Sequence, residues 1–396
     1  MRVLWLAREL PFPIDSGDRI YTASLARALA STGVRVRVLG HAPKPGTVFP
    51  VDDPVEWRTV PGDRRGRLAA LASPLPVFAA IHATAGYRAA LRAELEAPWD
   101  AVVLDQLGSG WALEVCRAAR EGPGRRVPIV HIAHNDETAI WRALATHAEG
   151  GLAGRLTVRL NAGRVARLER AVLARADLVT AITSEDASAF AARMPGLRTL
   201  VLTPGFQGPP AEPRTIDRST PRRVLLMGSY GWVVKQENLR RFLAAADPVF
   251  AAAGIGLDVV GRMPDPLHAT LAPGLRATTL HGFVQDVAPL LRRARIAVVP
   301  ELIGGGFKLK LLDYVFGRIP VATLAAAAAG LDPNLRARML CSRDLESLVS
   351  GVVETIDRVE RLDQMQREAF ELAQSGFRWG DRGAALRGAI EASGRG

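Results

Sequence analysis

Short apolar runs alternate with amphipathic helical patterns along the whole chain. In the first half we expect strands at residues 2–7, 34–40, 101–106, 127–134, 178–183 and 198–205. In the second half we expect them at residues 222–229, 255–261, 278–283, 295–302, 319–324 and 337–342. The apolar periodicity of residues 19–32 predicts a helix that Gly33 ends. Strands that alternate with helices are typical of parallel sheets covered by helices, so the pattern predicts an α/β fold.

Residues 208–221 interrupt this alternation with four prolines and polar side chains, as a linker does. A chain of 396 residues is also too long for one hydrophobic core. We therefore expect two Rossmann-like domains facing a cleft, at residues 1–207 and 222–375, with the linker at 208–221 between them. We expect residues 376–396 to form a C-terminal helix that packs on one of the two halves. In one of these arrangements the chain crosses back to the first domain.

The net charge of +11 is compatible with nucleic acid, an anionic membrane or a phosphorylated substrate as partner. Only four of the 51 basic residues are lysine: Lys44, Lys235, Lys308 and Lys310. The two cysteines, Cys116 and Cys341, lie far apart in apolar stretches and predict two buried, reduced thiols, as in a cytoplasmic protein. The sequence predicts neither a signal peptide nor a transmembrane helix, because its apolar runs stay below ~18 residues.

Residues 304–317, GGGFKLKLLDYVFG, follow the strand expected at 295–302 and predict a helix over 307–317. Lys308 and Lys310 would oppose the helix dipole at its N-terminus unless an anion is bound there. The three glycines would let backbone N–H groups converge on such an anion, as at a phosphate site. The alternative is a flexible surface turn with solvated lysines. The scarcity of lysine elsewhere favours the anion site.

A second loop, at residues 227–242, follows the first strand of the second half and contains Gly228 and Lys235. Loops that follow parallel strands share one rim of the sheet, so we expect Lys235 near Lys308 and Lys310. Asn238 is predicted to cap the helix that begins after it.

A third loop begins with His134, Asn135, Asp136 and Glu137 after the strand expected at 127–134. A helix N-terminus there accounts for Asn135 or Asp136 as the cap and for Glu137 in the first turn. It does not require His134, which is left for a role in the cleft. A structural role is the alternative for this histidine.

The sequence offers little for a metal site or a covalent nucleophile. His131 and His134 are three residues apart without a third ligand in range, and no Asp-x-Asp, Walker or Gly-x-Ser-x-Gly motif is present. This composition favours transfer of a group that a phosphate leaving group already activates.

The segment from Arg155 to Arg175 predicts a helix with an inward stripe of Val165, Leu168 and Val172. A solvated face accounts for its arginines, and contact with an anionic membrane or a phosphate-bearing acceptor is the alternative. Nucleic acid is not expected as a partner, because no aromatic residues interleave with the arginines.

Several segments resemble the retaining GT-B glycosyltransferases of the family numbered four. LPFPIDSGDRIYTASLARALASTGVRVRVLG is similar to that family's first loop and helix, and HNDETAIWRALA is similar to its His-Asn-x-Glu segment. VLTPGF resembles the strand before the linker, and MGSYGWVVKQEN resembles the loop of the second domain. The strongest likeness is the Gly-x-Lys-x-Lys stretch. There Asp313 falls on the second of two acidic family positions eight residues apart, and Gly305 replaces the first.

The resemblance implies sugar transfer from a nucleotide diphosphate sugar to a natural-product or glycan acceptor, with retention and without a metal or other cofactor. It implies His134 and Lys308 as catalytic residues and Asn135 and Glu137 as acceptor contacts. The implied donor-binding residues are Gly17, Gly228, Ser229, Lys235, Gly304, Gly305, Gly306, Phe307, Lys310 and Asp313. The alternatives are a catalytically silent sugar-nucleotide or partner-binding module, a sugar-nucleotide epimerase, and a lipid-linked glycan assembly enzyme at the inner face of the membrane.

Overall fold

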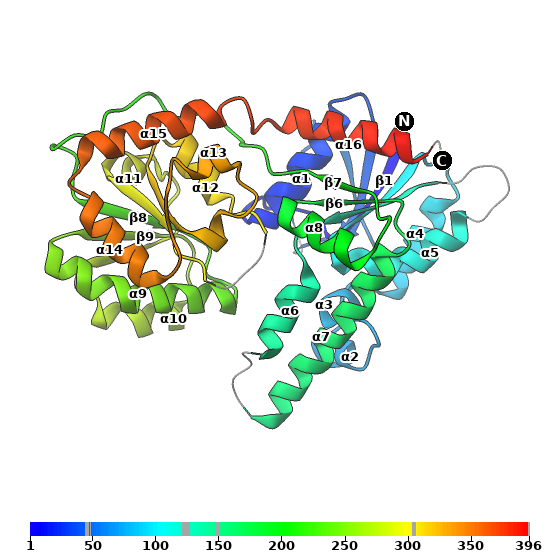
Figure 1. Cartoon of the computed structure of the whole chain (residues 1–396). Helices are drawn as coiled ribbons and strands as arrows, with labels where there is room; N and C mark the ends of the chain where they lie inside the picture. The colour runs from blue at the N-terminus through cyan, green and yellow to red at the C-terminus, as the bar shows by residue number, and fades with distance from the viewer. Residues whose placement is uncertain (44–46, 48, 121–126, 147–150, 303–305, 395–396) are drawn as a thin grey trace. The chain divides into compact units, whose positions relative to one another are not determined.

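The computed structural model describes residues 1–396 except 44–46, 48, 121–126, 147–150, 303–305 and 395–396. The chain divides into unit 1, Met1–Pro204 with Trp379–Gly396, and unit 2, Gly205–Arg378 (Figure 1). Each unit holds one parallel sheet with helices around it, which confirms the expected α/β class with two Rossmann-like domains. Residues 205–221, which include the predicted linker, belong to unit 2.

The sheet of unit 1 has seven strands in the order β3-β2-β1-β4-β5-β6-β7. The strands are β1 (Arg2–Glu9), β2 (Arg35–His41), β3 (Val55–Thr59), β4 (Ala101–Asp105), β5 (Ile129–Ala133), β6 (Leu178–Ala181) and β7 (Thr199–Val201). All were predicted except β3. This edge strand has mostly polar, exposed side chains, so it lacks the apolar run that marks the buried strands.

Unit 1 contains nine described α-helices and one 3₁₀-helix, and the helix expected at 19–32 is confirmed as α1. They are α1 (Gly17–Ala30), α2 (Arg67–Leu71), α3 (Val77–Ala80), α4 (Ala85–Leu95), η1 (Leu107–Ala112), α5 (Leu113–Arg120), α6 (Glu137–Thr146), α7 (Leu152–Leu173), α8 (Ser184–Arg193) and α16 (Trp379–Ser393). Gly33 follows α1 with a φ of 86°, a left-handed conformation that favours glycine. The C-terminal helix α16 packs alongside α1 (Figure 1).

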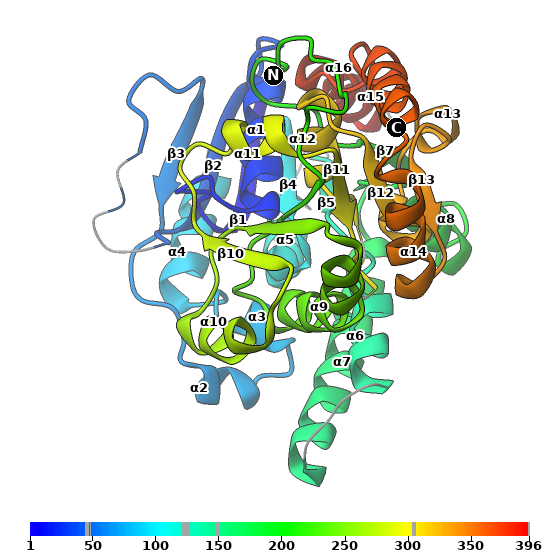
Figure 2. The same cartoon turned by 90° about the vertical axis from the view of Figure 1, so that its left-hand side faces the viewer.

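The sheet of unit 2 has six strands in the order β10-β9-β8-β11-β12-β13, and all six were predicted. They are β8 (Arg223–Met227), β9 (Gly256–Val260), β10 (Thr278–Gly282), β11 (Ile296–Val299), β12 (Val321–Leu324) and β13 (Leu340–Ser342). Its helices are α9 (Val233–Ala253), α10 (Asp265–Leu271), η2 (Ala272–Gly274), α11 (Ala288–Arg293), α12 (Lys310–Phe316), η3 (Ala325–Ala328), α13 (Pro333–Arg336), α14 (Leu345–Thr355) and α15 (Val359–Ala373). Helices α9, α10 and α14 cover one face of the sheet, and α11, α12 and α15 cover the other (Figures 1 and 2).

The expectation of two buried thiols is half wrong. Cys116 is buried in unit 1, but Cys341 is exposed. Cys341 lies on β13, the edge strand of its sheet, where one side of the strand is not paired with another strand of the described chain. In the described part of the chain, no helix has the length and apolar character needed to cross a membrane.

Candidate active site

In unit 2, three of the four lysines gather about one carboxylate, that of Glu301. Strands β8 and β11 are neighbours, so the loops after them emerge at one rim of the sheet. Lys310 donates a hydrogen bond from Nζ to Glu301 Oε1 at 2.6 Å. Burial alone would raise the pKa of Glu301. The positive charge of Lys310, assisted more weakly by Lys308 and Lys235, instead holds that pKa below its ordinary value. Glu301 was not singled out from the sequence, because an acidic residue after a strand also fits an ordinary turn.

The helix expected over 307–317 begins later, as α12 at Lys310, so Lys308 and Phe307 precede it in a loop. Lys308 donates from Nζ to the Gly306 carbonyl at 3.2 Å, and Gly306 has a φ of 69°. The Phe307 ring lies 6.2 Å from that of Phe377. Predicted residues Gly304 and Gly305 fall outside the described residues. The two lysines therefore differ, because Lys310 is in an ion pair while Lys308 is held by the loop backbone.

Asp313, one of the predicted donor-binding residues, lies on α12 and is exposed, while its helix neighbours Leu312 and Tyr314 are buried. The side chain can be reached by a ligand, although desolvation by the protein around it raises the pKa of its carboxyl group to about 6.

Asn238 does not cap a helix, and that prediction is wrong. Helix α9 begins at Val233, five residues before Asn238, which places Asn238 inside the helix. Its Oδ1 accepts a hydrogen bond from the backbone N–H of Leu302 at 3.1 Å. The buried side chain thus ties α9 to the loop that carries Glu301.

Gly228 and Ser229 follow β8 directly, as the sequence suggests. A side chain at Gly228 would meet the Tyr230 ring at 2.7 Å, so close packing by Tyr230 already requires a glycine there. Ser229 is half-buried next to it. A role of either residue in donor binding stays a prediction.

In unit 1, His134 is the end member of a buried polar network. Its Nε2 lies 2.9 Å from Asp105 Oδ1, and Thr22 donates from Oγ1 to Asp105 Oδ2 at 2.6 Å. Asp105 is 1% exposed and ends β4, next to β5, which precedes His134. The Tyr21 ring and the imidazole pack edge to face, with 4.9 Å between the ring centroids. Asp105 thus fixes the orientation of His134, a partner that sequence analysis missed.

The network borders a cavity of about 370 Å³ at the carboxyl ends of β1 and β4. Arg8 and Asp18 line it and form an ion pair at 3.1 Å. Gly17, the predicted phosphate contact, is exposed at the first position of α1, immediately before Asp18. His82 also lines the cavity, and its buried Nδ1 has no hydrogen-bond partner within the part of the chain that the structure describes.

Gln106 lines the same cavity in a strained backbone conformation. Its φ of 60° and ψ of 158° fall in a region that is almost restricted to glycine. Its N–H donates to the Ile132 carbonyl at 2.9 Å, which holds the residue in place. Strain of this kind is concentrated at functional sites, so it agrees with a ligand site at this rim.

The other residues of the His134 loop start a helix, as predicted. Helix α6 begins at Glu137, and Asp136 Oδ1 accepts from the N–H of Ala139 at 2.9 Å, which makes Asp136 the cap. Asn135 donates from Nδ2 to Glu137 Oε1 at 3.3 Å. Acceptor binding by Asn135 and Glu137 stays a prediction.

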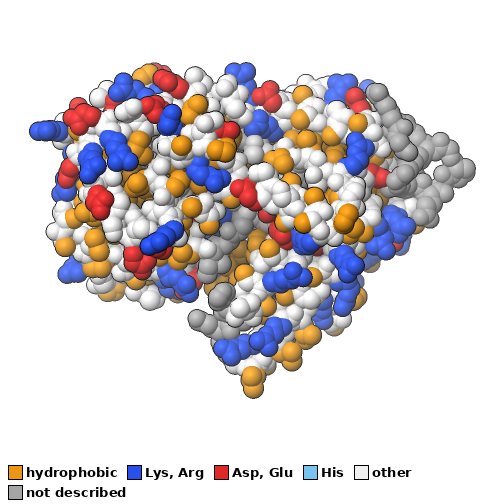
Figure 3. All heavy atoms as spheres, viewed as in Figure 1, with side chains coloured by type: hydrophobic (Ala, Val, Ile, Leu, Met, Phe, Trp, Pro, Cys, Tyr) orange, Lys and Arg blue, Asp and Glu red, His pale blue; other side chains and the backbone are white. Residues whose placement is uncertain are grey.

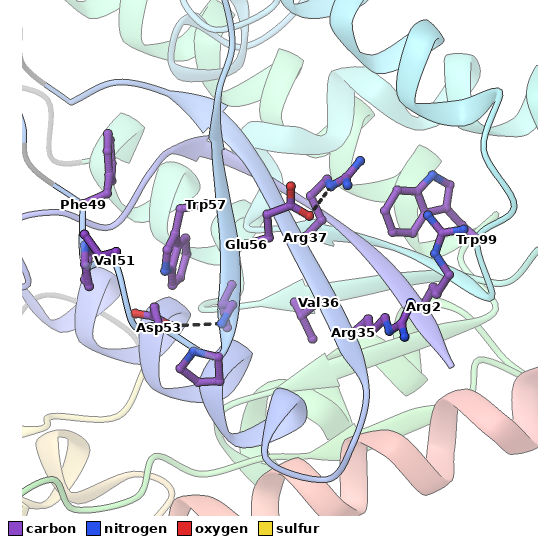
Figure 4. A pocket seen from close by; sticks show the side chains of 13 residues that line it. Arg2, Arg35, Val36, Arg37, Phe49, Val51, Asp53, Glu56, Trp57 and Trp99 are labelled. Atoms are coloured by element: carbon purple, nitrogen blue, oxygen red, sulfur yellow. Dashed lines mark hydrogen bonds and ion pairs between the residues drawn. The ribbon is translucent and has the colours of Figure 1, made fainter.

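A larger pocket, of about 550 Å³, lies at the β3-β2-β1 side of the sheet in unit 1 (Figure 4). Arg2 and Arg35, which line it, begin β1 and β2, so it includes the amino ends of these strands. Arg37 pairs there with Glu56 and Glu94, each at 2.7 Å, and the Arg2 guanidinium stacks over Trp99 at 4.8 Å. Because ligands of parallel sheets bind at the carboxyl ends, we assign this pocket to packing and not to the active site.

The described residues include no group of three or more His, Cys, Asp or Glu side chains that could hold a metal ion. That the protein transfers sugar from a nucleotide diphosphate sugar without a metal ion stays a prediction.

Two Rossmann-like units in one chain, each with polar side chains at the carboxyl-end rim of its sheet, fit the GT-B class, and the structural neighbours of the chain have this fold. Two family models match the chain: "Glycosyl transferase 4-like domain" over residues 16–205 and "Glycosyl transferases group 1" over residues 221–358. Together these matches span most of the chain, and the protein belongs to the group 1 glycosyltransferases. It is therefore a transferase enzyme. A search of curated sequences found no match.

Solved structures of the same fold resemble nearly the whole chain. Sucrose-phosphate synthase from Thermosynechococcus elongatus is 18% identical with a TM-score of 0.71, covering 99% of this chain and 98% of its own. WaaG, a glycosyltransferase of lipopolysaccharide biosynthesis, is 19% identical with a TM-score of 0.67, covering 97% and 99%. Anabaena HepE, solved in complex with UDP and glucose, is 16% identical with a TM-score of 0.62, covering 99% and 100%. At these identities the likeness establishes the fold.

Proposed function

We propose that this glycosyltransferase moves a sugar from a nucleotide diphosphate sugar to a glycan or natural-product acceptor, with retention of the anomeric configuration. The observation that carries the proposal is the ion pair of Lys310 with Glu301 at 2.6 Å, on the rim of unit 2 where the loops that contain Lys235 and Lys308 also emerge. Three ammonium groups against the two carboxylates of Glu301 and Asp313 leave an excess of positive charge at this rim. A departing diphosphate, which gains negative charge as the glycosidic bond breaks, fits that excess.

Each group has a distinct role in this proposal. Lys308 stabilises the leaving diphosphate, while Lys310 is oriented by Glu301 and acts at the edge of the same anion. Asp313, exposed on α12, accepts hydrogen bonds from the ribose hydroxyls. HepE, a structural neighbour, was solved with UDP and glucose, which supports a nucleotide and a sugar as the ligands of this fold.

In unit 1, His134 positions the transferred sugar or the acceptor hydroxyl, with its ring held by Asp105. The proton of the acceptor passes to the leaving phosphate itself, so the reaction requires no separate protein base. We also place the protein in the cytoplasm.

Two measurements test the proposal. A thermal-shift panel of UDP, GDP, TDP and ADP and their common sugars should show one nucleotide that raises the melting temperature. Proton NMR of the first product formed from the matching donor should show the anomeric configuration of that donor. Inversion would refute retention, and donor conversion into another nucleotide sugar without an acceptor would indicate an epimerase. Binding without hydrolysis or transfer, with every acceptor class tried, would leave only a binding module.

A further inference from the structure

Four helices of unit 1, α2, α3, α6 and α7, lie together and extend away from the sheet (Figures 1 and 2). We call them the projection. Helix α7 is its longest member, with 22 residues, and α6 packs along it. The N–H of Val77 on α3 donates to Asn161 Oδ1 of α7 at 2.9 Å, and Arg164 of α7 donates to the Leu71 carbonyl of α2 at 3.0 Å. The four helices therefore form one fixed surface.

The outward face of α7 contains three exposed leucines. Leu152, Leu156 and Leu160 are 86%, 58% and 57% exposed, and their spacing of four residues places them along one stripe. Leu68 on α2 is 84% exposed. Val165 and Val172, on the opposite face of α7, are fully buried. This face packs on the core of unit 1, so the exposed leucines are not needed for that packing. A solvated helix face would not place a second apolar stripe toward water.

Positive charge surrounds these leucines. The described parts of the four helices contain seven arginines, and their only acidic residues, Glu137 and Glu169, are half-buried and buried. The arginines are Arg67, Arg142, Arg155, Arg159, Arg164, Arg167 and Arg170. The space-filling view shows blue and orange side chains together on the lower part of the molecule, where the projection lies (Figure 3). The combination of exposed leucines with arginines and no exposed carboxylate is typical of helices that lie at a membrane interface.

We propose that the projection docks on an anionic phospholipid surface. The leucines of α7 insert between the headgroups and the arginines pair with the lipid phosphates. A second copy of this chain is the poorer occupant, because a symmetric contact would bring the same arginines against each other. The proposal does not depend on the sugar-transfer reaction, since neither the Glu301 cluster nor the His134 network is part of the projection.

Vesicle co-sedimentation of the full chain tests the proposal with phosphatidylcholine vesicles, with and without phosphatidylglycerol. We expect binding only to the anionic vesicles, weaker at high salt. The double variant Arg159→Gln/Arg167→Gln should bind about fivefold more weakly for each arginine removed. The matched control is Arg343→Gln/Arg361→Gln, which removes the same charge from exposed positions of unit 2 and should bind as the wild type does.

The double variant Leu156→Ser/Leu160→Ser tests the leucines. It should lower vesicle binding roughly tenfold and abolish the binding that persists at high salt. Val249→Ser/Leu372→Ser, at positions 42% and 43% exposed in unit 2, is the control. Unchanged melting temperatures and nucleotide-induced shifts would show that these variants stay folded and keep the donor site. Equal losses in the arginine variant and its control, or no preference for anionic vesicles, would overturn the proposal. So would a leucine-dependent dimer, or leucine-dependent binding to an acidic protein, without vesicle binding.

Discussion

At the scale of single residues, the two neighbouring lysines of the unit 2 rim have different partners. Lys310 forms an ion pair with Glu301 at 2.6 Å, and Lys308 donates a hydrogen bond to the carbonyl of Gly306 at 3.2 Å. The lysines at these two positions therefore have different roles. Lys310 neutralises a carboxylate whose desolvation would make it costly to leave unpaired, and Lys308 is the lysine that we propose to bind the leaving diphosphate.

Replacing Lys308 by alanine should lower turnover by about two to three orders of magnitude, since one preorganised donor to a leaving group is typically worth that much. The melting temperature should fall less than it does for Lys310→Ala, because Lys308 donates a hydrogen bond to the neutral carbonyl of Gly306 whereas Lys310 donates one to the Glu301 carboxylate. Steady-state kinetics and thermal melts on the same preparation check both statements. Lys310→Ala, in contrast, should lower the melting temperature as well. A loss of tenfold or less for Lys308→Ala would remove this lysine from the site.

His131, on the inner strand β5, is expected to make stability depend on pH. It is 2% exposed, and burial lowers its pKa to about 4, with Leu104 and Asp105 acting in the opposite direction and His134 in the same one. An unfolded histidine titrates near 6.5. Above that pH the residue is neutral in both states. Between 6.5 and 4 only the unfolded chain takes up the proton, so stability falls as the pH falls.

The loss from His131 should amount to roughly 3 kcal/mol over that interval. Chemical denaturation at several pH values, for the wild type and His131→Asn, measures it. Asparagine keeps a donor for the Leu104 carbonyl, which lies 3.0 Å from His131 Nδ1. The variant should be less stable at neutral pH but lose less stability on acidification. Parallel curves for the two proteins would contradict this assignment.

At the scale of elements, two buried tyrosines of unit 2 offer a matched comparison. The backbone N–H of Met227, at the end of β8, donates to the Tyr314 hydroxyl on α12 at 2.7 Å. The hydroxyl of Tyr230, also buried, has no hydrogen-bond partner among the described residues. Tyr314→Phe should therefore cost about 1–3 kcal/mol of unfolding free energy, because it leaves a backbone N–H unpaired. Tyr230→Phe should be neutral or stabilising. Urea unfolding of both variants would show whether this order holds.

Two glycines of α16 make a second comparison, which reports on how this helix packs. A Cβ on Gly383 would lie 2.1 Å from the Ala28 carbonyl of α1, whereas a Cβ on Gly388 would meet nothing within 4 Å. Gly383→Ala should force the two helices apart and destabilise unit 1 by about 1–3 kcal/mol. Gly388→Ala should stabilise it by about 0.5–1 kcal/mol, the helix propensity gained. Thermal unfolding of the two variants gives the comparison, and equal effects would mean that α16 does not pack closely on α1.

The sequence predicted the buried strands because each is a short apolar run between helical patterns. It missed β3, whose exposed polar side chains carry no such signal. It also located Lys235, Lys308 and His134, since each lies just after a strand. Asp105 and Glu301 were missed because a carboxylate at the end of a strand reads as a turn residue. Only the three-dimensional pairing of neighbouring strands brings these carboxylates to His134 and to the lysines.

At the scale of the whole molecule, the two units differ in how the chain builds them. Unit 2 is one continuous segment, Gly205–Arg378, while unit 1 combines Met1–Pro204 with the final helix. Leu386 and Ile390 of α16 are buried, so unit 1 needs its C-terminal segment to complete the packing around α1. Unit 2 has its own core, which includes Phe242, Phe250 and Tyr314.

We therefore expect residues 205–378, expressed alone, to unfold cooperatively, and residues 1–204 alone to be markedly less stable than the same residues in the full chain. The isolated unit 2 contains the whole Glu301 and lysine cluster. A nucleotide at about 100 times its dissociation constant should thus stabilise it by about 2.7 kcal/mol, and Lys308→Ala should reduce the affinity. Thermal melts of both fragments, with and without nucleotide, measure these effects. If residues 1–204 melted as they do in the full chain, α16 would contribute nothing to unit 1. If unit 2 folded but bound no nucleotide at any concentration, the lysine cluster alone would not form the donor site.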